Sequence, residues 1–589
     1  MKKNILFYTI YCIGLFTISA CKTDPKVEPT IAAITKESTV FVRLRAEPDN
    51  LNPMLTTKGH ATQVCHYMFP TLLDYDPFTK KLSPVLVKSR PKVEEITEGE
   101  RKGWTGYFYE ILDEAVWDDG SPVTGNDYLF TMKTLFNPHV GSGPYRPYLS
   151  LIKDIAIDPA NPKKYTVYTD EKYIKAEYAT GLFIYPQYKF DPDKVMDSYT
   201  YADIRDPAKE EQYKNDEILK SFGETFNSPM FSRDPEFVGG CGAYKLEEWI
   251  EGERVVLVKK DNWWGDKIKD KYPMLTAYPK RIVFKPISDA TTALTLMKNQ
   301  ELDVITVIPE DQFLEFKESE IGKQSINFHT PDAFVYNYYG LNTKRPKLSD
   351  KRVRHALAHL FDRDEVFRTV SPFAEPIIGP FHPMRSYYNN DLKPIQLDVE
   401  KAKKLLAEAG WKDTNNNGTL DKVIDGESLE MELDLLITPS NKVSSSMGLI
   451  FQNEARKAGV RINVVEKDAA ALFAQLRSRD FDIYALAASA ELSIDDPKQF
   501  WHTESDVPSG QNRFGFGNAE SDKLIDDIRS ELDETKRDVL FKKLQKIIYD
   551  EQPAIFLYVT KNRIAVNKKF KGVEMTIKSP GFFVNYWYE

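Results

Sequence analysis

The chain has 589 residues, of which 42% are hydrophobic and 28% are charged, and its net charge is −9. This composition is typical of a globular protein and excludes a mainly disordered one. Lysine and arginine are spread along an acidic chain without a long basic block, which argues against a nucleic-acid partner. Chains beyond about 250–300 residues usually divide, so we expect two or three packed units.

The first 21 residues predict an export signal with a lipid anchor. Lys2 and Lys3 precede an apolar run over residues 5–20, which is short for a membrane span. Residues 18–21 (ISAC) resemble the bacterial lipobox, whose cysteine becomes lipidated and N-terminal. The alternatives are an uncleaved membrane anchor and a plain signal peptide with a chance cysteine. We expect Cys21 to anchor the protein to a membrane, with residues 22–37 as a flexible tether.

Strand and helix patterns alternate from residue 38 to about residue 560. Residues 39–45 (TVFVRLR) alternate apolar and polar side chains, which indicates a strand. Thr124, with Asp127 three residues later, predicts the start of a helix that ends at Asn137. Residues 243–260 contain a hairpin pattern, and residues 350–366 predict one amphipathic helix. The expected class is therefore α/β with mixed sheets.

Seven short motifs follow one another in a fixed order. They are 46–53 (AEPDNLNP), 117–124 (WDDGSPVT), 240–246 (GCGAYKL), 262–265 (NWWG), 301–303 (ELD), 350–357 (DKRVRHAL) and 400–411 (EKAKKLLAEAGW). Each motif alone is modest, but seven in order are specific. Over about residues 40–560 the series resembles extracellular solute-binding protein family 5, the oligopeptide- and dipeptide-binding proteins of ABC importers. Asn52, Cys241 and Ala243 depart from the usual Asp, Thr and Pro at turn and packing positions.

The resemblance implies a two-lobed periplasmic-binding-protein-like fold (type II) in its large three-subdomain form, with mixed sheets and a hinge cleft. Lobe I is expected to be discontinuous, and its pieces are residues 38–56, 190–325 and 553–589. Residues 57–189 form an inserted subdomain of lobe I, and residues 326–552 form lobe II. The lobes are expected to close over a ligand, a known mode of conformational switching.

The implied function is binding rather than catalysis. A monomeric lipoprotein, on the periplasmic side of a membrane or on the outer cell surface, captures a peptide and delivers it to the permease of an ABC importer. No cofactor is required. One alternative keeps the fold but binds an oligosaccharide or a metal chelate. Another is a lipid-anchored hydrolase that uses Asp118 and Asp119, but adjacent residues of a strand or turn point apart.

The resemblance also implies ligand-binding residues near a late Asp-Pro pair. In peptide binders of this family, an Asp before that pair holds the amino group of the ligand. Here the segment is 489–497 (SAELSIDDP), and the anchoring position falls on Ser493. The expected substitutes are Glu491 or Asp495, with Ser489 in the same segment. The alternatives are charges in a surface loop, or a ligand without a free amino terminus.

Three more ligand-binding candidates lie earlier in the chain. Glu47 and Asp49 occupy the region where family members run a strand along the ligand, although an Asx turn also explains them. Tyr145 lies on a glycine-rich loop, residues 141–145 (GSGPY), and is a candidate wall of the cleft.

Residues 413–421 resemble the start of a calcium loop. Oxygen-bearing side chains recur at every second position, namely Asp413, Asn415, Asn417, Thr419 and Asp421. The twelfth position, which holds a bidentate Glu in such loops, is Ile424. The two interpretations are a structural calcium site and a plain Asn-Gly turn.

Overall fold

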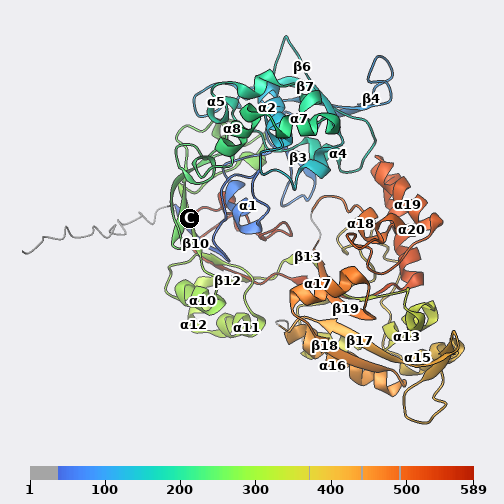
Figure 1. Ribbon diagram of the computed structural model, residues 1–589. Coiled ribbons are helices and arrows are strands. Elements are labelled where there is room, and N and C mark those ends of the chain that lie inside the picture. Colours follow the sequence, from blue (N-terminus) through green and yellow to red (C-terminus); the bar gives the residue numbers. More distant parts are fainter. Residues whose placement is uncertain (1–37, 370–371, 440–441, 490–491) are drawn as a thin grey trace, which may run out of the picture.

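The structure is a computed structural model that describes residues 38–369, 372–439, 442–489 and 492–589 (Figure 1). The predictions for the export signal, for Cys21, for the tether and for Glu491 concern residues outside these ranges. Among the described residues, no helix combines the length and apolar character that a membrane crossing requires.

A seven-stranded mixed sheet forms the centre of lobe I, in the order β12-β21-β11-β1-β10-β9-β8. Its strands are β1 (Thr39–Leu44), β8 (Tyr244–Ile250), β9 (Arg254–Lys259), β10 (Arg281–Pro286), β11 (Val304–Ile305), β12 (Ile326–His329) and β21 (Ile564–Asn567). Because Val40, Val42 and Leu44 alternate along β1, all three enter one core cluster. Three helices, α10 (Ala290–Lys298), α11 (Glu310–Glu318) and α12 (Glu320–Ser325), build a second cluster with the same sheet. The predicted strand and hairpin are confirmed.

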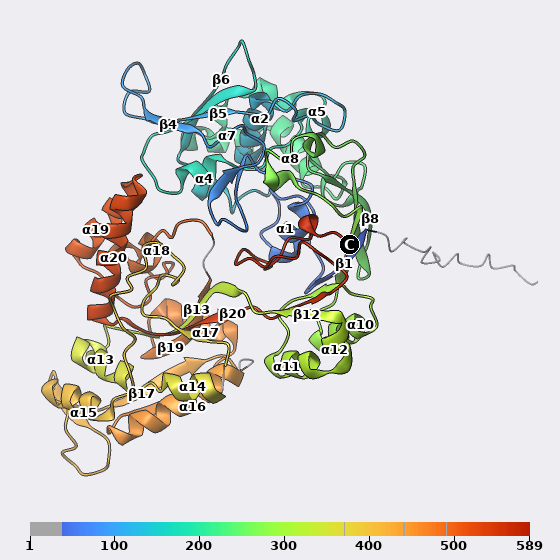
Figure 2. The ribbon, with the colours of Figure 1, turned by 180° about the vertical axis from the view of Figure 1, so that it is seen from behind.

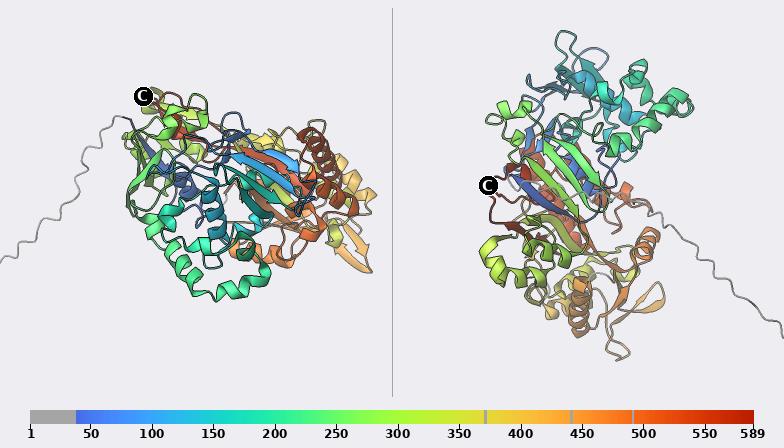
Figure 3. Two further views of the ribbon diagram at one scale, coloured as in Figure 1. Left: turned by 90° about the horizontal axis from the view of Figure 1, so that it is seen from above. Right: turned by 90° about the vertical axis from the view of Figure 1, so that its left-hand side faces the viewer.

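A second subdomain is inserted after β1. Its four-stranded sheet has the order β4-β5-β7-β6. Its elements are α1 (Gly59–Cys65), β2 (Leu73–Tyr75), β3 (Leu82–Pro84), β4 (Lys92–Glu95), β5 (Thr105–Glu110), α2 (Gly125–Phe136), α3 (Arg146–Leu149), β6 (Ile152–Ile157), β7 (Lys164–Thr169), α4 (Ala176–Thr180) and α5 (Gln187–Phe190). The subdomain shares one continuous core with the seven-stranded sheet, so the two parts of lobe I form one packed body. In the right panel of Figure 3 it lies above that sheet, and lobe II lies below.

Four further helices, α6 (Tyr201–Ile204), α7 (Glu210–Lys214), α8 (Glu217–Phe226) and α9 (Met230–Arg233), lead back to the seven-stranded sheet.

The cysteines Cys65 and Cys241 are both buried and free.

Lobe II is built on a six-stranded sheet in the order β14-β20-β13-β19-β17-β18. Its strands are β13 (Asp332–Leu341), β14 (Glu375–Pro376), β17 (Glu432–Ile437), β18 (Arg461–Glu466), β19 (Ile483–Ser489) and β20 (Ala554–Lys561). Apolar side chains cover both faces, as β17 shows: Leu435 and Ile437 enter one cluster, and Leu436 enters the other. The helices are α13 (Lys351–His359), α14 (Arg363–Thr369), α15 (Val399–Glu408), α16 (Lys442–Lys457), α17 (Ala469–Ser478), α18 (Lys498–Trp501), α19 (Ala519–Ser530) and α20 (Glu534–Glu551), and a side hairpin pairs β15 (Asp421–Ile424) with β16 (Glu427–Glu430).

The single helix predicted over residues 350–366 is wrong, because α13 ends at His359 and α14 begins at Arg363. Asp362 accepts a hydrogen bond from the backbone N–H of Glu365 (2.9 Å), as a residue at a helix start does. The guanidinium of Arg363 donates to the carbonyls of Ile395 and Phe556. These long-range bonds fix the start of a new helix at this point.

The chain crosses between the two sheets twice, where β12 leads into β13 and where β20 leads into β21 (Figure 2). Both pairs of strands are antiparallel, and the backbone N–H of Asn562 donates to the carbonyl of Pro331 (2.8 Å) between them. The crossings fall at residues 330–331 and 562–563. The predicted boundaries at 325/326 and 552/553 are therefore too early, because β12 belongs to the sheet of lobe I and β20 to that of lobe II.

Thr124 and Asp127 form a capping box at the start of α2, which confirms the predicted helix. We expect Thr124→Ala to lower the free energy of unfolding by about 1 kcal/mol, which corresponds to a fall of a few degrees in the melting temperature. Differential scanning calorimetry measures the change. The control is Thr225→Ala. The hydroxyl that it removes donates to the carbonyl of Ser221 in the same helix and caps no helix end. Equal melting temperatures for the two variants would contradict this role of the cap.

Candidate functional site

The segment that follows β19 reaches the interface between the lobes. Ser489 is exposed at the end of β19 and pairs with Val335 of β13. Leu492 and Ser493 are both buried. We call residues 492–496 the closure segment. It contains Ser493 and Asp495, and in the chain it lies between strand β19 and helix α18.

Arg385 holds the closure segment inside lobe II. Its guanidinium donates to the carbonyls of Leu492 (2.9 Å) and Ser493 (2.8 Å). Asp495 accepts from the hydroxyl of Tyr387 (2.7 Å) and forms an ion pair with Arg385 (3.3 Å). The side chain of Asp495 is still 20% exposed. A cationic ligand group there would share the carboxylate with Arg385.

Apolar side chains from both lobes meet at the other end of the segment. Leu492 of lobe II forms one buried cluster with Phe334 at the start of β13 and Ile577 of the C-terminal segment. Tyr75, the last residue of β2 in the inserted subdomain, packs against this cluster. The cluster therefore joins four parts of the chain that are distant in sequence.

Asp496 makes a polar contact with the inserted subdomain. The hydroxyl of Tyr173 donates to its carboxylate (2.8 Å), and the same carboxylate accepts from Nε of Arg529 on α19 (3.1 Å). Tyr173, Arg529 and Arg385 are not among the residues predicted from the sequence. None of them lies in a recognisable motif. Because their partners are far away in the chain, no local pattern marks them.

The candidates predicted in lobe I bond to lobe I itself. Glu47 accepts from the indole N–H of Trp249 (2.5 Å) and from the backbone of Gly252 (3.2 Å), which fixes it to the β8–β9 hairpin. Asp49 accepts from the hydroxyl of Thr56 (2.7 Å). The hydroxyl of Tyr145 donates to the carbonyl of Pro53 (2.9 Å). Asp49 and Tyr145 thus hold the same loop, while Asp495 is held in lobe II.

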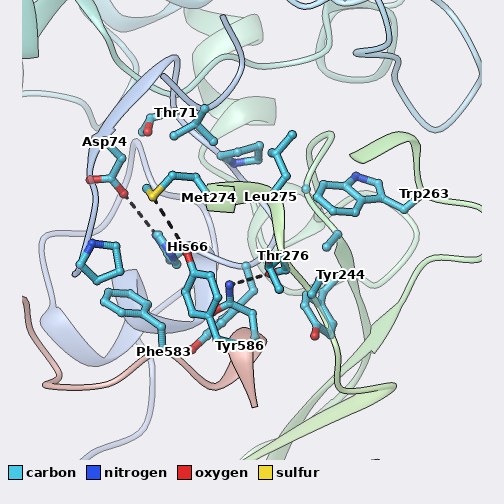
Figure 4. Close-up of a pocket in the computed structure, with 18 of the residues that line it drawn as sticks. His66, Thr71, Asp74, Tyr244, Trp263, Met274, Leu275, Thr276, Phe583 and Tyr586 are labelled. Carbon is cyan, nitrogen blue, oxygen red and sulfur yellow. Dashed lines mark hydrogen bonds and ion pairs between the residues drawn. The ribbon is translucent and has the colours of Figure 1, made fainter. Parts of the chain in front are cut away.

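A small cavity lies in lobe I beside the apolar cluster (Figure 4). Its volume is about 60 Å³, enough for a few water molecules at about 10–15 Å³ each, whereas drug-sized ligand pockets begin near 300 Å³. Asp74 and Lys578 line it and form an ion pair (2.5 Å). The residues next to them in the sequence, Tyr75 and Ile577, contact lobe II in the apolar cluster. The ion pair therefore helps to fix the backbone that carries these two side chains.

His66 points toward Asp74 in the same cavity (Figure 4), with 3.8 Å between the ring and the carboxylate. Burial and the ammonium of Lys578 lower the pKa of His66 to about 4, although Asp74 acts in the opposite direction. About a third of the side chain reaches solvent, which weakens the effect. The folded protein thus holds a neutral imidazole at neutral pH.

The oxygens of the predicted calcium loop accept hydrogen bonds from the loop itself. Asp413 accepts from the backbone of Asn417 (3.1 Å) and Gly418 (3.0 Å), and Asn415 accepts from Asn417 (3.0 Å). Asn417 accepts from the backbone of Thr419 (2.8 Å), and the carboxylate of Asp421 accepts from the backbone of Thr414 (2.7 Å). Gly418 has a φ of 84°, a conformation that favours glycine in turns. These contacts build an Asn-Gly turn from protein atoms, and the calcium site stays a prediction.

Two lobes that are joined by two crossing segments are the architecture of a solute-binding protein. The family model for bacterial extracellular solute-binding proteins, family 5, matches residues 98–511, which is more than half of the chain. The chain belongs to this family.

Relatives are similar in sequence, and solved structures share the fold. The chain is 28% identical over 353 residues to the oligopeptide-binding protein AppA of Bacillus subtilis (strain 168), and the match covers 59% of this chain and 62% of AppA. The structure of AppA from Bacillus subtilis in complex with a nonapeptide has a TM-score of 0.62 at 22% identity and covers 93% of this chain and 98% of that chain. NikZ from Campylobacter jejuni in complex with Ni(L-His) has a TM-score of 0.66 at 20% identity and covers 94% and 100%. The predicted family and the predicted two-lobed fold class are confirmed.

The pKa of His66 predicts a pH dependence of stability. Between pH 6.5 and pH 4 the unfolded chain takes up a proton that the folded chain does not, so stability falls as the pH falls through this range. In His66→Gln this contribution is absent, and we expect its melting temperature to fall less on acidification than that of the wild type. His60→Gln, in the preceding helix, is the control. Identical pH profiles for wild type and His66→Gln would refute the prediction.

Proposed function

We propose that this protein captures a peptide between its two lobes and delivers it to the permease of an ABC importer. Membership of the solute-binding family carries the proposal, and the oligopeptide-binding relative supports a peptide as ligand. The same reasoning gives a binding protein that acts as a monomer without a required cofactor. In this proposal Cys21 anchors the exported protein by a lipid, and residues 22–37 tether it.

The closure segment is the proposed binding region of lobe II. An extended peptide pairs its backbone with exposed backbone groups of the protein. Such binding depends little on which side chains the peptide carries. Asp495, together with Glu491 and Ser489 just before the segment, is proposed to hold the amino end of the peptide. Glu47, Asp49 and Tyr145 are proposed to act from lobe I, where they position the loop over residues 49–56.

A metal chelate is the second candidate ligand. One structure with this fold holds a nickel–histidine complex, and the usual Asp is replaced by Ser493 in this chain. Among the described residues, no group of three or more His, Cys, Asp and Glu side chains is placed to hold a metal ion. A chelate would therefore be recognised through its organic part. The third candidate, an oligosaccharide, stays an alternative.

Mass spectrometry of small molecules that co-purify with residues 37–589 tests the ligand class. We expect a mixture of short peptides, because a closed cleft retains its ligand. Such a peptide should bind Glu491→Ala about tenfold more weakly in isothermal titration calorimetry, through loss of a charge-assisted hydrogen bond. Glu520→Ala, an exposed change on α19, should bind normally. A single chelate or sugar would contradict the peptide proposal and keep the family.

A calcium titration tests the loop over residues 413–421. Since its own backbone already occupies the side-chain oxygens, we expect excess calcium to leave the melting temperature within about 1 °C of its starting value. Magnesium at the same ionic strength is the control. A rise with calcium alone would establish the predicted calcium site instead.

A further inference from the structure

Helix α4 of the inserted subdomain and helix α19 of lobe II lie on the sides of the two lobes that face each other (Figures 1 and 2). The chain just before α4 makes a direct contact with lobe II. There the hydroxyl of Tyr173 donates to the carboxylate of Asp496 at 2.8 Å. The next residue, Ile174, donates its backbone N–H to the carbonyl of Arg529 at 2.9 Å. One bond is made by a side chain and the other by the backbone, and they lie side by side.

Arg529 takes part in both contacts. Its Nε lies 3.1 Å from each oxygen of Asp496, so the carboxylate is paired within lobe II and oriented toward Tyr173. Its guanidinium also lies 5.1 Å from the centre of the Tyr173 ring, within the range of a cation–π contact. The side chain of Asp496 is only 14% exposed. Hydrogen bonds to a shielded carboxylate are stronger than those at an open surface.

Apolar packing accompanies the polar contact. The side chain of Ile174 packs against a hydrophobic cluster of lobe II. At the other end of the closure segment, Leu492 packs with Ile577 and Tyr75 of lobe I. The closure segment therefore touches lobe I at both ends, and all of these contacts are made by the protein itself.

We propose that Tyr173, Ile174, Asp496 and Arg529 form a latch that stabilises the closed arrangement of the lobes through contacts of the protein alone. The inference rests on the proposed function in one respect, namely that the lobes open to admit a solute. The latch adds the same stabilisation to the closed state whether or not a solute is present. It thus raises affinity by lowering the cost of closure rather than by contacting the ligand. A solute bound at Asp495 would act on the same segment.

Single-molecule Förster resonance energy transfer between two dyes measures the closed population directly. Dyes are placed on residues 37–589, which lack Cys12 and Cys21, at Ala160→Cys in the inserted subdomain and at Ala407→Cys in α15. Both positions are exposed, whereas Cys65 and Cys241 are buried. Unfolding in guanidinium and refolding removes any bound solute, so the measurement needs no known ligand. Circular dichroism confirms that each variant is folded.

We expect the ligand-free wild type to have a measurable closed fraction. Tyr173→Phe removes one hydroxyl and keeps the ring, and it should raise the ratio of open to closed molecules about tenfold. Asp496→Asn should act in the same direction. Tyr148→Phe, at an exposed tyrosine of the same subdomain (65% exposed), should match the wild type.

Variants with the wild-type distribution would overturn the latch, as would a ligand-free wild type without any measurable closed fraction. If the variants open as expected but no solute ever co-purifies with the wild type, the latch stands and the proposed function fails. The two proposals are therefore tested separately.

Discussion

Backbone hydrogen bonding between the two crossing segments determines how the lobes can move. His329 pairs with Ile564 in the sheet of lobe I, and Asp332 pairs with Lys561 in the sheet of lobe II. The bond from Asn562 to Pro331 lies between these pairs. Because the two segments run antiparallel as one bent ribbon, sliding of the lobes would break its register. Rotation about the ribbon keeps most of these bonds, which makes opening and closing the accessible motion.

With such a hinge, the angle between the lobes determines whether contacts far from the two crossing segments can form. Tyr173 and Asp496 lie 323 residues apart in the sequence and belong to different lobes. A hydrogen bond tolerates only a few tenths of an ångström, so a rotation at the hinge breaks this bond while the sheets stay intact. The latch therefore discriminates between the open and closed states, and the hinge by itself does not.

The sequence predicted features that depend on neighbouring residues. Thr124 and Asp127 stand three positions apart, so the capping box can be recognised without any tertiary information. The family followed from the order of seven motifs. The break between α13 and α14 was missed because it depends on the bonds of Arg363 to Ile395 and Phe556, which are long-range. The partners of Glu47 could not be predicted either, since Trp249 reaches it only after the β8–β9 hairpin has folded onto the loop.

Asp495 and Asp496 show why the binding site is harder to predict than the fold. The two carboxylates are adjacent in sequence, yet they have separate partners. Asp495 pairs with Arg385 and Tyr387 within lobe II, whereas Asp496 pairs with Arg529 and reaches Tyr173 across the interface. A sequence pattern cannot distinguish a carboxylate that binds a ligand from one that closes the protein. In this segment the proposed binding carboxylate and the proposed latch carboxylate lie one residue apart, so a solute that displaced Asp495 would also move Asp496. Binding and closure would then be coupled through one peptide bond rather than through a distant pathway.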